Sequence, residues 1–254
     1  MSNNQILVDK FNRIKADKSL ADDEKNLKLN EISDELIKST IDCYDNTATL
    51  YGDLRAEVGG WNTLLWSVFE YGIEVFENGR RALKVLDIGA SVGRELIHGQ
   101  KLGYDMYGVE LSNGFLVLLD KLYADGKIKN KVKKCDMRAL DYSDNFFDAV
   151  SHVATLLHMP VIGKGYTADK ALEETNRILK TGGIVYVVVK EGSPELKIHN
   201  TGEGLGSRVF QFFSMESLCE VIKRNGFEIL LANKLQEIRP KETVDTLAVV
   251  ARKV

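Results

Sequence analysis

Polar and apolar positions follow a helical spacing over the first part of the chain. Between residues 3 and 36, leucine, isoleucine, valine and phenylalanine recur every three or four positions among lysines, aspartates and asparagines. This spacing predicts amphipathic helices. The polar run at residues 17–19 interrupts the pattern, so we expect two helices here. Two more helices are expected between residues 39 and 77, the second of them after Gly59 and Gly60.

From Gly79 onward, short β-rich runs alternate with helical ones. Strands are predicted at residues 83–87, 105–110, 131–135, 147–152 and 183–190. Helices are predicted between them at residues 93–102, 113–124 and 167–179. The last helix is expected to end in a left-handed turn at residues 181–183. Because the strands are apolar on both faces, they belong in a parallel sheet that helices cover on each side.

The end of the chain departs from this alternation. Ser214 can cap a helix that runs to Arg224. Residues 227–235 and 246–252 then form two strands joined by a turn around Pro240. An antiparallel hairpin therefore closes the sheet, and the expected fold is α/β with seven strands, most of them parallel.

Composition and charge narrow the class of protein. Apolar residues make up 44% of the chain and charged residues 28%, as in ordinary globular proteins. No apolar run approaches the roughly 20 residues of a membrane-spanning helix, and no secretion signal begins the chain, so we expect a cytoplasmic protein without membrane contact. The net charge of -3 disfavours nucleic acid and favours a small or neutral partner.

We expect a helical extension at residues 1–40 and one α/β domain at residues 41–254.

The segment from Val85 to Gly93 carries the strongest chemical signal. It is an apolar strand that runs into a glycine-bounded turn and then directly into a helix. Such a turn exposes backbone N–H groups at the helix N-terminus and permits close approach of a ligand. A tight turn without a ligand is the alternative interpretation.

An acidic residue ends the next strand. Glu110 follows Asp87 by 23 positions, and a carboxylate there can accept both hydroxyls of a ribose. A dinucleotide fingerprint would require glycines two and five positions after Gly89, where Ser91 and Arg94 stand instead. The sequence therefore predicts a nucleoside pocket that does not hold a dinucleotide.

The pattern Asp-x-Gly-x-x-x-Gly from Asp87 to Gly93 resembles motif I of class I S-adenosylmethionine-dependent methyltransferases. Ser91 stands where that family commonly has glycine. Further segments resemble the family in the same order, at residues 135–137, 147–160, 179–192, 209–218 and 225–227. The resemblance covers residues 41–254 and implies a Rossmann-like fold. It also implies S-adenosylmethionine as the cofactor and S-adenosylhomocysteine as its product.

The same resemblance implies the residues that bind the cofactor. Asp87 is expected near the methionine end, Asp136 at the adenine amino group, and Met137 over the adenine ring. The full set that we predict is Asp87, Gly89, Ala90, Ser91, Gly93, Glu110, Leu111, Asp136, Met137 and Val153. No metal site is expected, because neither the three cysteines nor the acidic residues show ligand spacing.

Three residues are candidates for catalysis. His158 follows the fourth strand on the sheet edge of the cofactor turn, and its imidazole can take a proton near neutral pH. The alternative is a histidine that orients the loop or contacts the cofactor. Tyr44 and Tyr51 resemble a family segment that closes over the methionine end or the acceptor, with plain packing as the alternative. Residues 191–207 are expected either to border the acceptor pocket or to form a mobile surface loop. The candidate contacts to a polar substrate are Glu191, Glu195, Lys197, His199 and the adjoining Arg208.

The leading hypothesis is transfer of a methyl group to a nitrogen or oxygen atom of a small-molecule acceptor by in-line displacement. One alternative is methylation of RNA or protein, with the N-terminal helices as a docking surface. Another is a non-catalytic regulatory protein that binds S-adenosylmethionine. The N-terminal helices themselves are expected to be a packing appendage, with a substrate lid or a homodimer contact as the alternatives.

Overall fold

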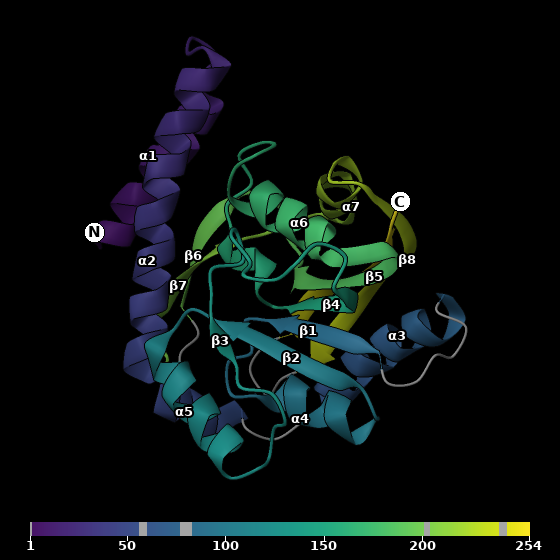
Figure 1. Cartoon of the computed structure of the whole chain (residues 1–254). Helices are drawn as coiled ribbons and strands as arrows, with labels where there is room; N and C mark the ends of the chain where they lie inside the picture. Colours follow the sequence, from purple (N-terminus) through teal and green to yellow (C-terminus); the bar gives the residue numbers. More distant parts are fainter. Residues whose placement is uncertain (1, 56–59, 77–82, 201–203, 239–242) are drawn as a thin grey trace.

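The computed structural model describes residues 2–55, 60–76, 83–200, 204–238 and 243–254 (Figure 1). The helices are α1 (Asn3–Ala16), α2 (Asp22–Arg55), α3 (Gly60–Phe76), α4 (Arg94–Lys101), α5 (Asn113–Ala124), the short 3-10 helix η1 (Leu156–His158), α6 (Thr167–Ile178) and α7 (Met215–Arg224). The strands are β1 (Lys84–Ile88), β2 (Asp105–Glu110), β3 (Lys133–Lys134), β4 (Phe147–Val153), β5 (Leu179–Lys190), β6 (Leu196–Asn200), β7 (Ser207–Gln211), β8 (Phe227–Ile238) and β9 (Thr243–Lys253). None of the helices in these ranges combines the length and the apolar character that a bilayer crossing requires.

Seven of these strands form one sheet in the order β3-β2-β1-β4-β5-β9-β8. The pairs from β3 to β5 are parallel, whereas β9 runs antiparallel to both β5 and β8. The predicted α/β fold, with a mostly parallel seven-stranded sheet and a C-terminal antiparallel hairpin, is confirmed. The predicted turn around Pro240 lies outside the described residues.

Helices cover both faces of the sheet, because successive strand residues point to opposite sides. Leu86 and Ile88 of β1 belong to the core cluster that α6 and α7 cover, while Val85 belongs to the cluster covered by α3, α4 and α5. Figure 1 shows α6 and α7 on one side of the sheet and α3, α4 and α5 on the other. The carboxyl ends of the parallel strands are thus held between two packed layers.

The N-terminal helices pack against the small two-stranded sheet of β6 and β7. Phe11 of α1 and Leu36 of α2 are buried in one cluster with Leu196 of β6 and Val209 of β7. Helix α2 continues through residue 40, so the prediction of a separate helix after Ser39 is wrong. The reason is that no glycine or proline occurs before Gly52, and nothing in the chain ends the helix earlier.

Two other local predictions are also wrong. Helix α6 ends at Ile178, before the predicted turn, and the next residue, Leu179, is extended and pairs with Phe147. Gly182 has the left-handed φ of +79° that the prediction required, but it lies within β5 and does not end the helix. Leu179 is fully buried, so tertiary packing overrides the helix-ending tendency of the glycines that follow. The mobile-loop interpretation of residues 191–207 fails as well, because Leu196 to Asn200 pair in register with Ser207 to Gln211.

Candidate functional site

A cavity of about 240 Å³ lies at the carboxyl ends of the parallel strands. Helix α2, helix η1 and the β6–β7 hairpin close the cavity on the side away from the sheet. Among the residues predicted for the site, those that line it are Tyr44, Tyr51, Gly89, Ser91, Glu110, Leu111, Asp136, Met137, Val153 and His158. The structure thus brings together side chains that are more than one hundred positions apart in the chain.

The other three predicted residues, Asp87, Ala90 and Gly93, do not line the cavity. Asp87 is buried at the end of β1, where its carboxylate accepts a hydrogen bond of 2.8 Å from the Ser151 hydroxyl. Ala90 is buried inside the turn, and Gly93 forms the left-handed start of α4. These residues therefore support the wall of the cavity from behind.

The turn after β1 is built for close approach. The N–H groups of Gly89 and Ala90 donate to the Val109 carbonyl at 2.9 and 3.0 Å, which fastens the turn to β2. Gly89 has φ of +79°, and a Cβ atom there would lie 2.6 Å from the side chain of Thr155. The narrow turn therefore leaves no room for a side chain at Gly89.

Ser91, which stands where the family commonly has glycine, has a left-handed backbone. Its φ is +50°, and its N–H donates to the Glu110 carboxylate at 2.9 Å. Its hydroxyl is buried and has no hydrogen-bond partner among the described residues. Because buried polar groups are normally paired, an orphan hydroxyl in the cavity wall points to a polar ligand.

Glu110 is held in place by backbone N–H groups. One oxygen accepts from Ser91, and the other accepts from Leu111 and Ser112 at 2.7 and 2.8 Å. Burial raises the pKa of Glu110, and these N–H groups oppose the shift. A carboxylate offers about four lone-pair positions, so one remains for a donor from the cavity, such as a ribose hydroxyl.

Asp87 is poised between two protonation states. Burial, and after it the neighbouring charge of Glu95, raises the pKa of Asp87 to about 8. The guanidinium of Arg94 pairs with Glu95 at 2.9 Å, and it also favours the ionised form of Asp87, but less than burial and Glu95 disfavour that form. A positive ligand bound near the turn would favour the ionised form of Asp87.

Tyr44 and His158 form a partly buried pair in the cavity. The Tyr44 oxygen lies 3.0 Å from Nε2 of His158, and Nδ1 lies 3.4 Å from the Val209 carbonyl. A carbonyl can only accept, so we assign the proton to Nδ1, and Nε2 then accepts from the Tyr44 hydroxyl. Burial lowers the pKa of His158 to about 3 and raises that of Tyr44 above its usual range. Both groups are therefore neutral near pH 7.

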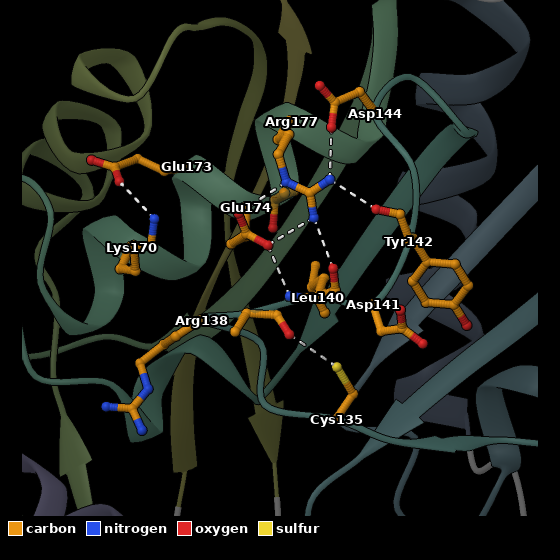
Figure 2. A network of polar contacts seen from close by, with 12 residues as sticks. Cys135, Arg138, Leu140, Asp141, Tyr142, Asp144, Lys170, Glu173, Glu174 and Arg177 are labelled. Atoms are coloured by element: carbon orange, nitrogen blue, oxygen red, sulfur yellow. Dashed lines mark hydrogen bonds and ion pairs between the residues drawn. The ribbon is translucent and has the colours of Figure 1, made fainter.

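The loop after β3 carries the predicted adenine contacts. The Asp136 carboxylate accepts from the Arg138 backbone N–H at 2.8 Å and from its guanidinium at 2.7 Å. Farther along the loop, Arg177 of α6 donates to the carbonyls of Leu140 and Tyr142 at 2.7 and 2.8 Å (Figure 2). Helix α6 thus fastens the loop that places Asp136 and Met137 at the cavity.

Several lining residues were not among the predicted set. Lys190, Arg94, Glu95 and Thr155 follow strand ends or turns, which is the same positional signal that singled out Glu110. Of the five candidate substrate contacts in and beside residues 191–207, His199 and Arg208 line the cavity. Glu191, Glu195 and Lys197 do not: Glu195 pairs with Lys197, and Glu191 pairs with Lys234.

Comparison with known proteins agrees with this geometry. Residues 86–187 match the methyltransferase domain family. The chain is 26% identical over 241 residues to sterol 24-C-methyltransferase ERG6B of Gibberella zeae, an alignment that covers 84% of this chain and 60% of that relative. The alignments with the curated relatives cover between 35% and 60% of the length of those relatives.

Two solved structures share the architecture. The [4+2]-cyclase SpnF has a TM-score of 0.60 and 18% identity, over 83% of this chain and 93% of that one. The 1,6-didemethyltoxoflavin-N1-methyltransferase of Burkholderia thailandensis has a TM-score of 0.58 and 19% identity, over 83% and 90% of the two chains. At such identities these structures show the fold, and the domain match covers residues 86–187. The chain therefore has the Rossmann-like fold that the sequence motifs predicted, and the central part of this fold matches the methyltransferase domain family.

Proposed function

We propose that this protein is an S-adenosylmethionine-dependent methyltransferase that acts on a nitrogen or oxygen atom of a small-molecule acceptor. One observation carries the proposal. The left-handed turn at Gly89 forms one wall of the cavity, and beside it the Glu110 carboxylate accepts hydrogen bonds from backbone N–H groups, all within the segment that matches the methyltransferase family. The named relatives and neighbours include enzymes that methylate small molecules, which supports the same class of acceptor.

The residues present suit this cofactor. Asp136 and Met137 would hold the adenine, Glu110 the ribose, and the Gly89 turn with the unpartnered Ser91 hydroxyl the methionine portion. When bound, S-adenosylmethionine supplies an electrophilic methyl group on a sulfonium. Asp87 lies behind this turn, and in its ionised form it would balance the positive charge.

The protein's own contribution is alignment and exclusion of water. The rings of Tyr44, Tyr51 and Phe115 contact one another, with centroids 5.3 to 6.0 Å apart, and they form an apolar wall beside the cofactor turn. His158 holds Tyr44 in position, and the Tyr44 oxygen keeps lone pairs that can accept a hydrogen bond from the acceptor. A proton that leaves the acceptor would reach His158 through this hydroxyl. A strong base is absent from this route, because the pKa of His158 is low.

The packing of the N-terminal helices favours a small acceptor over RNA or protein. Their apolar faces are buried against the β6–β7 hairpin, which itself lines the cavity. They therefore serve to close the site within one chain. A docking or homodimer surface would have to use their polar faces.

Calorimetry with S-adenosylhomocysteine tests the cofactor site. We expect the Glu110→Ala variant to bind at least tenfold more weakly than the unaltered protein, because a lost hydrogen bond to a charged group costs about 1.5–3 kcal/mol. Glu220→Ala, which alters an exposed position on α7, should bind normally. Unchanged affinity in a folded Glu110→Ala variant would contradict the assigned pocket.

A further inference from the structure

The cavity has a basic end that the cofactor assignment does not use. Lys190 at the end of β5, His199 on β6 and Arg208 on β7 all line it. The sheet order places β3, β2 and β1 on one side of β4, and β5 on the other. The predicted adenine, ribose and methionine contacts follow β3, β2 and β1 in turn, so Lys190 lies beyond the methionine end. His199 and Arg208 belong to the separate β6–β7 sheet, and the ring of Phe210 on β7 joins them to Lys190.

Arg208 is a buried cation held against aromatic rings. Only 3% of its surface is exposed, and its guanidinium carbon lies 4.7 Å from the ring centroid of Tyr44 and 5.9 Å from those of Tyr51 and Phe210. Its Nε has no hydrogen-bond partner among the described residues. Ring faces attract a cation but cannot replace a hydrogen-bonded anion, and a buried charge without a counter-ion is costly.

The carboxylates that line the same cavity are already engaged. Glu95 pairs with Arg94, Asp136 pairs with Arg138, and Glu110 accepts three backbone N–H groups. Within the described part of the chain, no carboxylate forms an ion pair with Arg208. The described part of the chain therefore supplies no counter-ion for this guanidinium, and an anionic ligand in the cavity would supply one.

A second cation stands beside it. The Lys190 ammonium lies 3.0 Å from Nε2 of His199 and 5.4 Å from the ring centroid of Phe210, the ring that Arg208 also faces. Since an ammonium can only donate, Nε2 of His199 accepts, and the imidazole is neutral. The His199 ring stacks on Phe210 with centroids 4.7 Å apart, which fixes its orientation.

We propose that the methyl acceptor is an anionic small molecule, whose carboxylate or ionised hydroxyl pairs with the Arg208 guanidinium beside the Lys190 ammonium. This inference rests on the proposed methyl transfer and specifies its substrate class. Where the ionised group is itself the attacking atom, the proposal also explains how the site works without a strong base, because the acceptor then arrives without the proton that a base would remove. Planar guanidinium groups match carboxylates in geometry, which suits arginine for this role.

The test uses methyl-labelled S-adenosylmethionine and a small-molecule extract of the source cells, separated beforehand by ion exchange into anionic, neutral and cationic pools. We expect label to enter products only from the anionic pool. Label from the neutral or cationic pool alone would overturn the anionic acceptor and leave the methyltransferase proposal standing. No label from any pool, with S-adenosylhomocysteine still bound in calorimetry, would contradict both.

Variants of Arg208 separate the acceptor from the cofactor. Arg208→Gln should raise the KM for the active pool at least tenfold while affinity for S-adenosylhomocysteine stays within twofold, and Arg208→Lys should recover part of the loss. Arg252→Gln, which removes an exposed guanidinium on β9, is the matched control and should behave as the unaltered protein. If Arg208→Gln instead weakens S-adenosylhomocysteine binding tenfold, Arg208 holds the cofactor's own carboxylate and the proposal fails. Should that variant not fold, Lys190→Gln is measured in its place, and it should likewise raise the KM for the active pool and leave the affinity for S-adenosylhomocysteine unchanged.

Discussion

The two walls of the cavity are built in different ways. The cofactor wall consists of turns that directly follow β1, β2 and β3, and its contacts are mostly backbone N–H groups from neighbouring positions. The opposite wall combines α2, η1 and the β6–β7 hairpin, and its contacts are side chains such as Tyr44, His158 and Arg208. Figure 1 shows α2 lying beside this hairpin, although more than one hundred residues separate them in the chain.

Because of this difference, the two walls should tolerate different kinds of substitution. A wall of backbone groups depends on φ angles and on close approach, so adding a side chain should damage it more than removing a polar group. A wall of side chains depends on packing across the tertiary structure, so each single substitution there should have only a moderate effect on binding or activity. The predictions below test this contrast.

The largest effect is expected at Gly89. Gly89→Ala would place a Cβ atom 2.6 Å from the Thr155 side chain, at a φ of +79°. We expect S-adenosylhomocysteine binding to fall at least about a hundredfold, because the turn must shift away from the ligand. Calorimetry on the folded variant measures it.

Gly103 supplies the matched control for this prediction. Its φ of +95° is also left-handed, but a Cβ atom there would meet nothing within 4 Å. Gly103→Ala should therefore lower the free energy of unfolding by about 1 kcal/mol and leave binding unchanged. Equal losses of binding in both variants would show that backbone strain alone, and not the close approach of the ligand, explains the loss of binding in Gly89→Ala.

The next effect concerns pH and Asp87. Because burial raises the pKa of Asp87 to about 8, the carboxyl is largely protonated below that pH. A cationic ligand favours the ionised form, so binding must release the proton and becomes weaker as pH falls. We expect affinity for S-adenosylmethionine to drop by up to about tenfold per pH unit between pH 8 and pH 6. Calorimetry over this range provides the measurement.

Two comparisons isolate the Asp87 charge. Asp87→Asn should bind weakly at every pH and lose this part of the pH dependence. S-Adenosylhomocysteine, which lacks the sulfonium charge, should show a shallower slope with the unaltered protein. A pH profile that is the same in Asp87→Asn would assign the proton to another group.

The same contrast between the two walls explains which parts of the fold and of the site could be predicted from the sequence. Gly89 and Glu110 were found because a glycine-bounded turn follows one strand and an acid ends the next, and local backbone geometry determines their place. Asp136 was found through the resemblance to the methyltransferase family. The β6–β7 hairpin was missed because four glycines between residues 191 and 207 suggested a loop, while the alternation in Leu196, Lys197 and Ile198 covers only a few positions.

The sequence also could not predict the pKa values of the side chains in the site. His158 was correctly brought to the cavity, but its low pKa follows from its partial burial between Tyr44 and the hairpin. That burial arises from contacts over 114 positions of sequence to Tyr44 and 51 to Val209. No local pattern carries such information, which is why its role as a base stays a prediction.

The smallest effect is expected on the side-chain wall, at Tyr44. Tyr44→Phe keeps the ring beneath Arg208 and removes the hydroxyl that donates to His158. The buried Nε2 then has no donor, which should lower the free energy of unfolding by about 1–3 kcal/mol. We expect kcat to fall about three- to tenfold with little change in cofactor affinity, since the ring still packs against Phe115. Tyr123→Phe, at an exposed site on α5, is the control. If Tyr44→Phe weakened cofactor binding as strongly as Gly89→Ala, the two walls would form one cooperative unit, and the separation of cofactor and acceptor sides would be wrong.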